Sequence, residues 1–116
     1  MPDARDAVIA DVRRLMDSGQ ELRSQILESR KGFTKGLALL ERGVPLSDAL
    51  AELNTAERRL RMTELLAEFD ECRHRLRISI TAAGLDEGMS IGDIGRAFGV
   101  SRQLAARFAK EVRGRP

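Results

Sequence analysis

The sequence predicts an all-α protein: a long antiparallel helical hairpin, similar to a coiled coil, followed by two short helices near the C-terminus. Two observations predict this fold. Apolar residues recur every three or four positions over long stretches, and neither stretch contains an alternating run of β-branched residues. Hydrophobic residues make up 42% of the 116 residues and aromatic residues only 3%, so the predicted core consists mainly of Leu, Ile, Val, Ala and Met.

The first predicted helix covers residues 3–41. Its apolar and small residues follow a mean spacing of 3.5, which is typical of a coiled-coil seam. This seam consists of Val8, Val12, Leu15, Gly19, Leu22, Ile26, Ser29, Phe33, Gly36 and Leu40. Ser18 and Glu21 have the spacing of a capping box, so a break at Ser18 is an alternative to one continuous helix. Gly43 and Pro45 are expected to end the helix.

The second arm of the hairpin is predicted over residues 55–83, after a short helix over 46–53 that Ser47 would cap. Asn54 and Glu57 repeat the capping pattern where the long helix begins. Its seam consists of Met62, Leu65, Phe69, Cys72, Leu76, Ile80 and Ala83. Two long amphipathic helices with a short connection are expected to fold back on each other.

The charge is distributed unevenly, although the net charge is only +2. Residues 1–94 carry 14 basic and 17 acidic side chains, whereas residues 95–116 carry six basic side chains and Glu111 as the one acid. Such asymmetry favours a nucleic acid or another anionic partner for the C-terminal segment. We therefore divide the chain into a scaffold over 1–83 and a basic segment over 84–116.

The basic segment contains the pattern of two helices joined by a tight turn. Ser90 and Ser101 are predicted N-caps, Gly99 is predicted to adopt the left-handed conformation at the turn, and Ile94 and Phe108 are predicted to face inward. The string DIGRAFGVSRQ, which starts at Asp93, is similar to the pattern D-I-A-x-x-x-G-V-S-R-x of DNA-binding helix-turn-helix proteins. Such motifs occur in region 4 of sigma factors, in resolvase tails and in small bacterial regulators. The resemblance covers about residues 88–110 only.

The resemblance implies that the second short helix binds the major groove of double-stranded DNA. The residues implied to contact bases are Arg102, Gln103, Ala106 and Arg107. The residues expected to contact phosphates are Ser90, Arg96, Ser101, Lys110, Arg113 and Arg115. Leu104-Ala105 departs from the family pattern, so the base-facing side of the helix stays open. The alternative is a structural helix pair whose arginines are simply solvated.

The resemblance also suggests a transcriptional regulator of bacterial type. The lack of a recognisable signal peptide or membrane span favours a cytoplasmic, nucleoid-associated location. A single helix-turn-helix contacts little DNA, so a homodimer through the N-terminal helices is favoured over a bundle within one chain. Two other functions stay open: a helical protein-interaction module, and an accessory DNA-binding protein of a recombinase or phage. Basic residues at Arg73–Arg77 could extend the DNA contact, although nearby carboxylates at ion-pair spacing favour a structural role.

Catalysis, metals and cofactors are not expected. His74 is the one histidine, so a di-metal site built from two Glu-x-x-His motifs such as Glu71–His74 cannot form within one chain. Cys72 and His74 would point about 200° apart on a helix, which does not suit a catalytic pair. One cysteine permits no internal disulfide, and no signal peptide, membrane span or small-molecule site is predicted.

Overall fold

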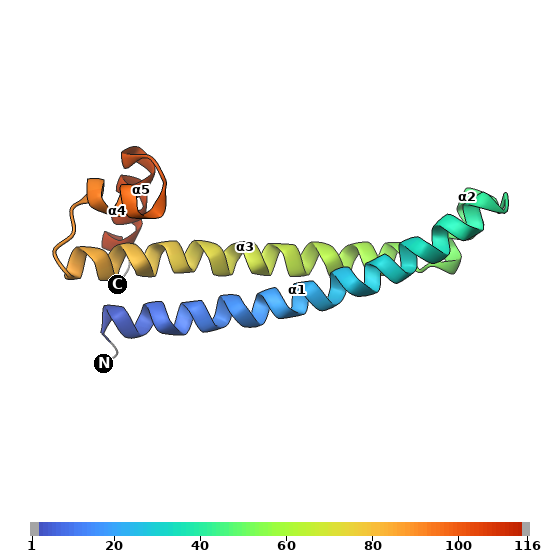
Figure 1. Cartoon of the computed structure of the whole chain (residues 1–116), viewed down its shortest axis with the longest axis horizontal. Helices are drawn as coiled ribbons and strands as arrows, with labels where there is room; N and C mark the ends of the chain where they lie inside the picture. The colour runs from blue at the N-terminus through green and yellow to red at the C-terminus, as the bar shows by residue number, and fades with distance from the viewer. Residues whose placement is uncertain (1–2, 115–116) are drawn as a thin grey trace. The chain divides into compact units, whose positions relative to one another are not determined.

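A computed structural model describes residues 3–114 of the chain, and these residues form helices and turns without any strand. The helices are α1 (Ala4–Glu41), α2 (Leu46–Glu52), α3 (Thr55–Asp86), α4 (Ile91–Phe98) and α5 (Arg102–Arg113), as labelled in Figure 1. The predicted all-α fold is therefore confirmed. Within this part of the chain, no helix is both long and apolar enough to cross a membrane.

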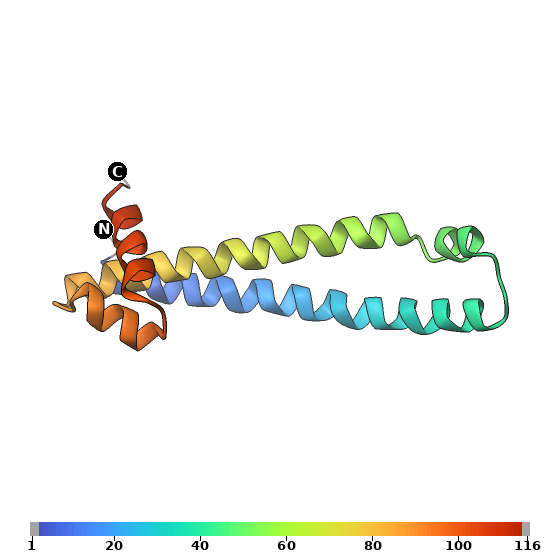
Figure 2. The ribbon, with the colours of Figure 1, turned by 90° about the horizontal axis from the view of Figure 1, so that it is seen from above.

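The helices pack as two compact units. The terminal unit contains Met1–Met16 and Glu71–Pro116, and the central unit contains Asp17–Asp70. In both units a stretch of α1 lies beside a stretch of α3, as Figure 1 and Figure 2 show. These units are defined by packing, whereas the predicted division into 1–83 and 84–116 is one of role and stays a prediction.

Contacts in the central unit show that its two long helices are antiparallel. A Cβ atom on Gly36 would lie 2.8 Å from a methyl carbon of Leu53, near the point where the chain reverses. Farther from that point, the guanidinium of Arg58 donates to the backbone carbonyl of Glu28 across 3.3 Å. The farther a contact lies from the reversal, the more residues separate its two partners in the sequence, as expected for two antiparallel helices. The predicted hairpin is therefore confirmed.

The predicted seam of α1 is wrong at four of its ten members, Val12, Ile26, Phe33 and Leu40. Leu22 and Gly36 are buried as predicted, but Ile26, Phe33 and Leu40 are exposed. Their places in the hairpin are taken by the residues one position earlier, which include the buried Gly32 and Leu39. The residues buried instead include the small Ser18 and Gly32, which allow α1 to approach α3 closely. A prediction that follows the spacing of large apolar residues does not select such positions.

The seam of α3 follows the prediction. Leu65, Cys72 and Ala83 are buried, and Met62 and Phe69 are partly buried between them.

Three predicted helix caps are wrong. Ser18 is buried inside a continuous α1, where the small neighbouring Gly19 lies against the Phe69 ring. Ser47 lies inside α2, which begins after Pro45 and has no side-chain cap. Asn54 has φ 51°, the left-handed conformation, rather than the extended backbone of an N-cap.

The terminal unit positions the two short helices against the end of α3. This helix extends to Asp86, three residues beyond the predicted end. The side chain of Ile94 in α4 approaches Gly84 of α3, where a Cβ atom would lie 3.2 Å from two of its carbons. A glycine at this position therefore lets α4 pack closely on α3.

Candidate nucleic-acid interface

The start of α4 is fixed by a capping box. The Ser90 hydroxyl oxygen accepts a hydrogen bond from the backbone N–H of Asp93 across 3.0 Å. In return the Asp93 carboxylate accepts from the backbone N–H of Ser90 across 3.1 Å. The two bonds satisfy two helix-end donors at once, so the predicted cap is confirmed.

The turn between α4 and α5 is closed by a pair of backbone hydrogen bonds. Val100 N–H donates to the Gly95 carbonyl across 2.9 Å, and Gly99 N–H donates to the Arg96 carbonyl across 3.3 Å. This is the Schellman pattern, which requires a left-handed residue, and Gly99 has φ 73°. Ser101 then caps α5 by accepting from Leu104 N–H across 3.1 Å.

Small residues allow α4 and α5 to approach each other. A Cβ atom on Gly95 would lie 3.1 Å from the Val100 carbonyl oxygen and 3.6 Å from the Ala105 Cβ. Ala105 is completely buried, and Ile94 and Phe108 retain 2% and 5% of their accessible surface. The inward positions of α5 are therefore filled by apolar side chains, as predicted.

A contact that the sequence analysis missed joins α5 to α3. His74 Nε2 lies 2.9 Å from Glu111 Oε1 and 3.1 Å from Oε2. The His74 ring also meets the Phe108 ring edge-on, with centroids 6.5 Å apart and an interplanar angle of 73°. Glu111, as the one acid within residues 95–116, was the available signal, but the sequence could not show which side chain it faces.

All four residues predicted to contact bases lie exposed on α5. Arg102, Gln103, Ala106 and Arg107 occupy relative positions 0, 1, 4 and 5, which fall on one face of a helix. Lys110 extends this face by one turn and is also exposed. We call these five residues the outer face of α5.

The predicted phosphate contacts are in different situations. Arg113 is exposed in the last turn of α5, whereas Arg115 lies outside the described residues. Arg96 Nη2 lies 2.6 Å from the Asp93 carboxylate, so this guanidinium is already paired within α4. Ser90 and Ser101 use their hydroxyl oxygens as caps, although each hydroxyl hydrogen can still be donated.

Two of the other basic residues have partners within the scaffold. Arg75 pairs with Glu71 one turn earlier on α3, across 3.2 Å. Arg58 is exposed, but its guanidinium donates a hydrogen bond to the backbone of α1. These contacts favour a structural role for both residues.

Asp93 links the pH to the stability of α4. Hydrogen bonds from the backbone and side chain of Ser90, and then from Arg96, lower the pKa of this carboxyl below its ordinary value of 3.8. Because the folded pKa is the lower one, the ionised group stabilises the folded state above pH 3.8. That contribution is lost as the pH falls through the folded pKa.

We expect Asp93→Asn to weaken the acid sensitivity of the terminal unit, because the amide cannot ionise. Unfolding free energies measured by denaturant titration should fall less for Asp93→Asn than for the wild type between about pH 5 and pH 2. Glu64→Gln on α3 controls for the loss of one carboxylate. Equal slopes for Asp93→Asn and the wild type would contradict the assigned cap.

We expect Gly99→Ala to lower the unfolding free energy by about 1–2 kcal/mol, because a left-handed backbone places Cβ against the next carbonyl. Gly92→Ala is the matched control within α4. Its Cβ would lie no closer than 3.5 Å to its nearest neighbour, so it should raise helix stability by up to about 1 kcal/mol. Denaturant unfolding measures both, and equal effects would argue against the turn.

No group of three or more His, Cys, Asp and Glu side chains within residues 3–114 is placed to hold a metal ion. Comparison of the chain with protein-family models, with curated proteins and with solved structures finds no match.

Proposed function

We propose that the protein binds double-stranded DNA in a sequence-specific manner through α5, as a dimeric transcriptional regulator of bacterial type in the cytoplasm. The observation that carries this proposal is the outer face of α5. Five polar, basic or small side chains are exposed there, while Ala105 and Phe108 on the opposite side are buried. A helix that packs against the protein on one side and is exposed on the other can insert into a groove of DNA.

The chemistry of this face fits base edges. An Arg side chain such as Arg102 or Arg107 can donate two hydrogen bonds to guanine, and Gln103 can bond adenine in the same two-point manner. The Ala106 methyl group can pack against the methyl group of thymine. Lys110 and Arg113, farther along the helix, are assigned to phosphates, which orient a protein without selecting a sequence.

The positive charge of the C-terminal residues also favours DNA as the partner. Residues 95–116 carry six basic side chains against one acidic side chain. Each phosphate neutralised by a basic side chain releases counterions, so binding should weaken steeply as salt is added. An affinity that falls with a log–log slope of about −0.9 per phosphate would indicate such contacts.

The test is selection of bound duplexes from a random pool. The affinity for the most enriched duplex is then measured at increasing salt concentration. The proposal predicts an enriched sequence with two related half-sites, since a dimer presents two copies of α5. It also predicts that a scrambled duplex of the same length binds more weakly. No salt-dependent duplex binding at low ionic strength would overturn the proposal.

A helical interaction module is the second candidate. Ile26, Phe33, Leu37 and Leu40 leave an apolar stripe exposed on α1. Exposed apolar patches of this kind mark interaction sites on soluble proteins. If the chain binds no duplex but forms a stable complex with a different protein through this stripe, the second candidate replaces the first.

A further inference from the structure

The α1 helix carries a second heptad seam that its own hairpin does not cover. In the central unit this outer seam consists of Arg23, Ile26, Arg30, Phe33, Leu37 and Leu40. All six are exposed, and Phe33 and Leu37 retain 76% and 58% of their accessible surface. The spacing alternates three and four residues, as in a helix that packs against another helix.

The accessible surface of the chain leaves room for such a partner. It measures 8486 Å², whereas a compact monomer of the same 12.9 kDa mass exposes about 6300 Å². The surplus of about 2200 Å² exceeds the roughly 800 Å² that each partner loses in a standard interface. The chain therefore exposes enough surface beyond that of a compact monomer to supply one side of a standard interface.

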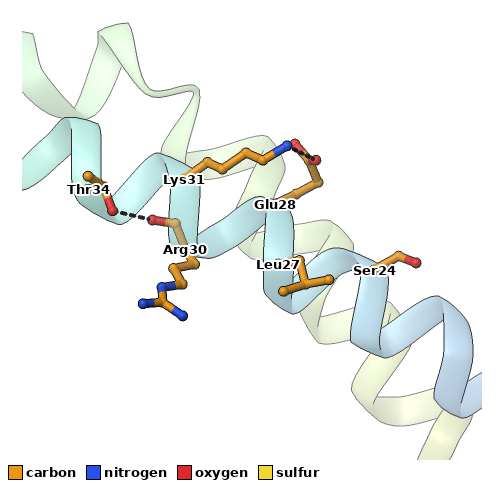
Figure 3. Close-up of a pocket in the computed structure, with 6 residues that line it drawn as sticks. All are labelled: Ser24, Leu27, Glu28, Arg30, Lys31 and Thr34. Carbon is orange, nitrogen blue, oxygen red and sulfur yellow. Dashed lines mark hydrogen bonds and ion pairs between the residues drawn. The ribbon is translucent and has the colours of Figure 1, made fainter.

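The surroundings of the seam match a helical occupant. On one side, a groove of about 560 Å³ runs between Ile26 and Phe33 of α1 and Met62 of α3. On the other side lies Leu27, which is 53% exposed. Figure 3 shows the Glu28–Lys31 ion pair nearby and the Arg30 side chain pointing away from that pair. Arg30 is thus directed away from the acid nearest to it on α1.

We propose that the outer seam binds a second copy of this chain, with the two α1 helices antiparallel. Both arginines, Arg23 and Arg30, occupy the same heptad position, whereas Ile26, Phe33 and Leu40 occupy the other. A parallel pair would place each arginine against its own equivalent, because like positions then face each other. An antiparallel pair places each arginine against an apolar residue instead.

One register pairs the whole seam with itself. Arg30 faces Phe33 of the second copy, Ile26 faces its Leu37, and Arg23 faces its Leu40. The guanidinium of Arg30 can then lie on the phenyl ring, where a cation is attracted to the ring face, while its aliphatic stem packs on the seam. Among residues 3–114 neither Arg23 nor Arg30 has an ion-pair partner, so this contact breaks none.

The inference specifies the surface and the orientation of the dimer in the proposed function, but it does not depend on DNA binding. Its first test therefore uses the full chain without DNA. Light scattering after gel filtration should give a mass near twice 12.9 kDa. The double variant Ile26→Glu/Leu37→Glu should give the monomer mass, because four carboxylates would enter the interface.

A matched control separates this surface from general loss of apolar area. Leu60 on α3 is 61% exposed but lies outside the seam, so Leu60→Glu should keep the dimer mass. Far-UV circular dichroism should show unchanged helix content in both variants, since all three positions are exposed. A monomeric wild type, a dimeric seam variant or a monomeric Leu60→Glu would each overturn the proposal.

The orientation is tested with spin labels on Ser24→Cys and, separately, Lys31→Cys. Both positions are exposed and share one heptad position, so a parallel dimer gives the same inter-label distance at both. In the antiparallel register, labels at position 24 are offset by about 22 Å along the helix axis and labels at position 31 by about 1.5 Å. Equal distances would overturn the antiparallel arrangement. Cys72 is buried. As a control, the unsubstituted chain is treated with the same spin label to check that Cys72 does not react.

Discussion

Phe108→Ala is expected to lower the unfolding free energy of the terminal unit by about 3–5 kcal/mol. Phe108 keeps only 5% of its accessible surface, and its ring meets His74 of α3 edge-on. Removing the ring leaves a cavity beneath α5, at the place where this helix is attached to the scaffold. The measurement is urea unfolding followed by far-UV circular dichroism.

Phe108→Leu provides the control for this change. It keeps most of the apolar volume, so we expect a loss below about 1.5 kcal/mol. Both variants must be compared at one protein concentration, because the stability of a dimer depends on it. An alanine variant as stable as the leucine variant would show that Phe108 does not hold α5 in place.

Arg102→Ala and Arg107→Ala, each made singly, are expected to weaken binding to the selected duplex by about 1–3 kcal/mol. This corresponds to a loss of about 5- to 150-fold in affinity. Neither side chain supports the fold, because both are exposed and neither has an ion-pair partner within residues 3–114. Titration of labelled duplex at fixed salt measures the loss for the selected and the scrambled sequence.

The matched controls are Arg59→Ala and Arg61→Ala on α3, which remove the same charge from the central unit. They should change the affinity little if the outer face of α5 carries the contact. A loss that is equal for selected and scrambled duplexes would make Arg102 and Arg107 phosphate contacts. Equal losses for the α3 variants would remove α5 from its proposed role.

The helix pair near the C-terminus was predictable because its signals are local. Ser90 with Asp93, Gly99 at the turn and Ser101 before α5 each act on backbone groups within three residues. Capping and turn geometry depend on such short separations, and the structure confirms them. The exposed positions of α5 followed from the same local pattern, whereas their contact with DNA stays a proposal.

The caps of the long helices were predicted less well, for a physical reason that Ser18 illustrates. A serine followed by a glutamate three residues later can begin a helix, but it can also lie within one. Packing of Gly19 against Phe69 and burial of Ser18 favour the continuous helix. The free energy of this packing outweighs a local preference for a cap.

Periodicity, caps and turns are properties of neighbouring residues, so the sequence alone was enough to predict a helical chain, the place where its long arms reverse and the turn from α4 to α5. Which stripe of α1 is buried is seen in the tertiary structure alone, because the small Ser18 and Gly32 are buried while the large Phe33 is exposed, and this choice depends on the fit to α3. The tertiary structure also decided that Glu111 meets His74, 37 residues away in sequence. Long-range pairs of this kind depend on how helices pack, and a single sequence does not encode that packing locally.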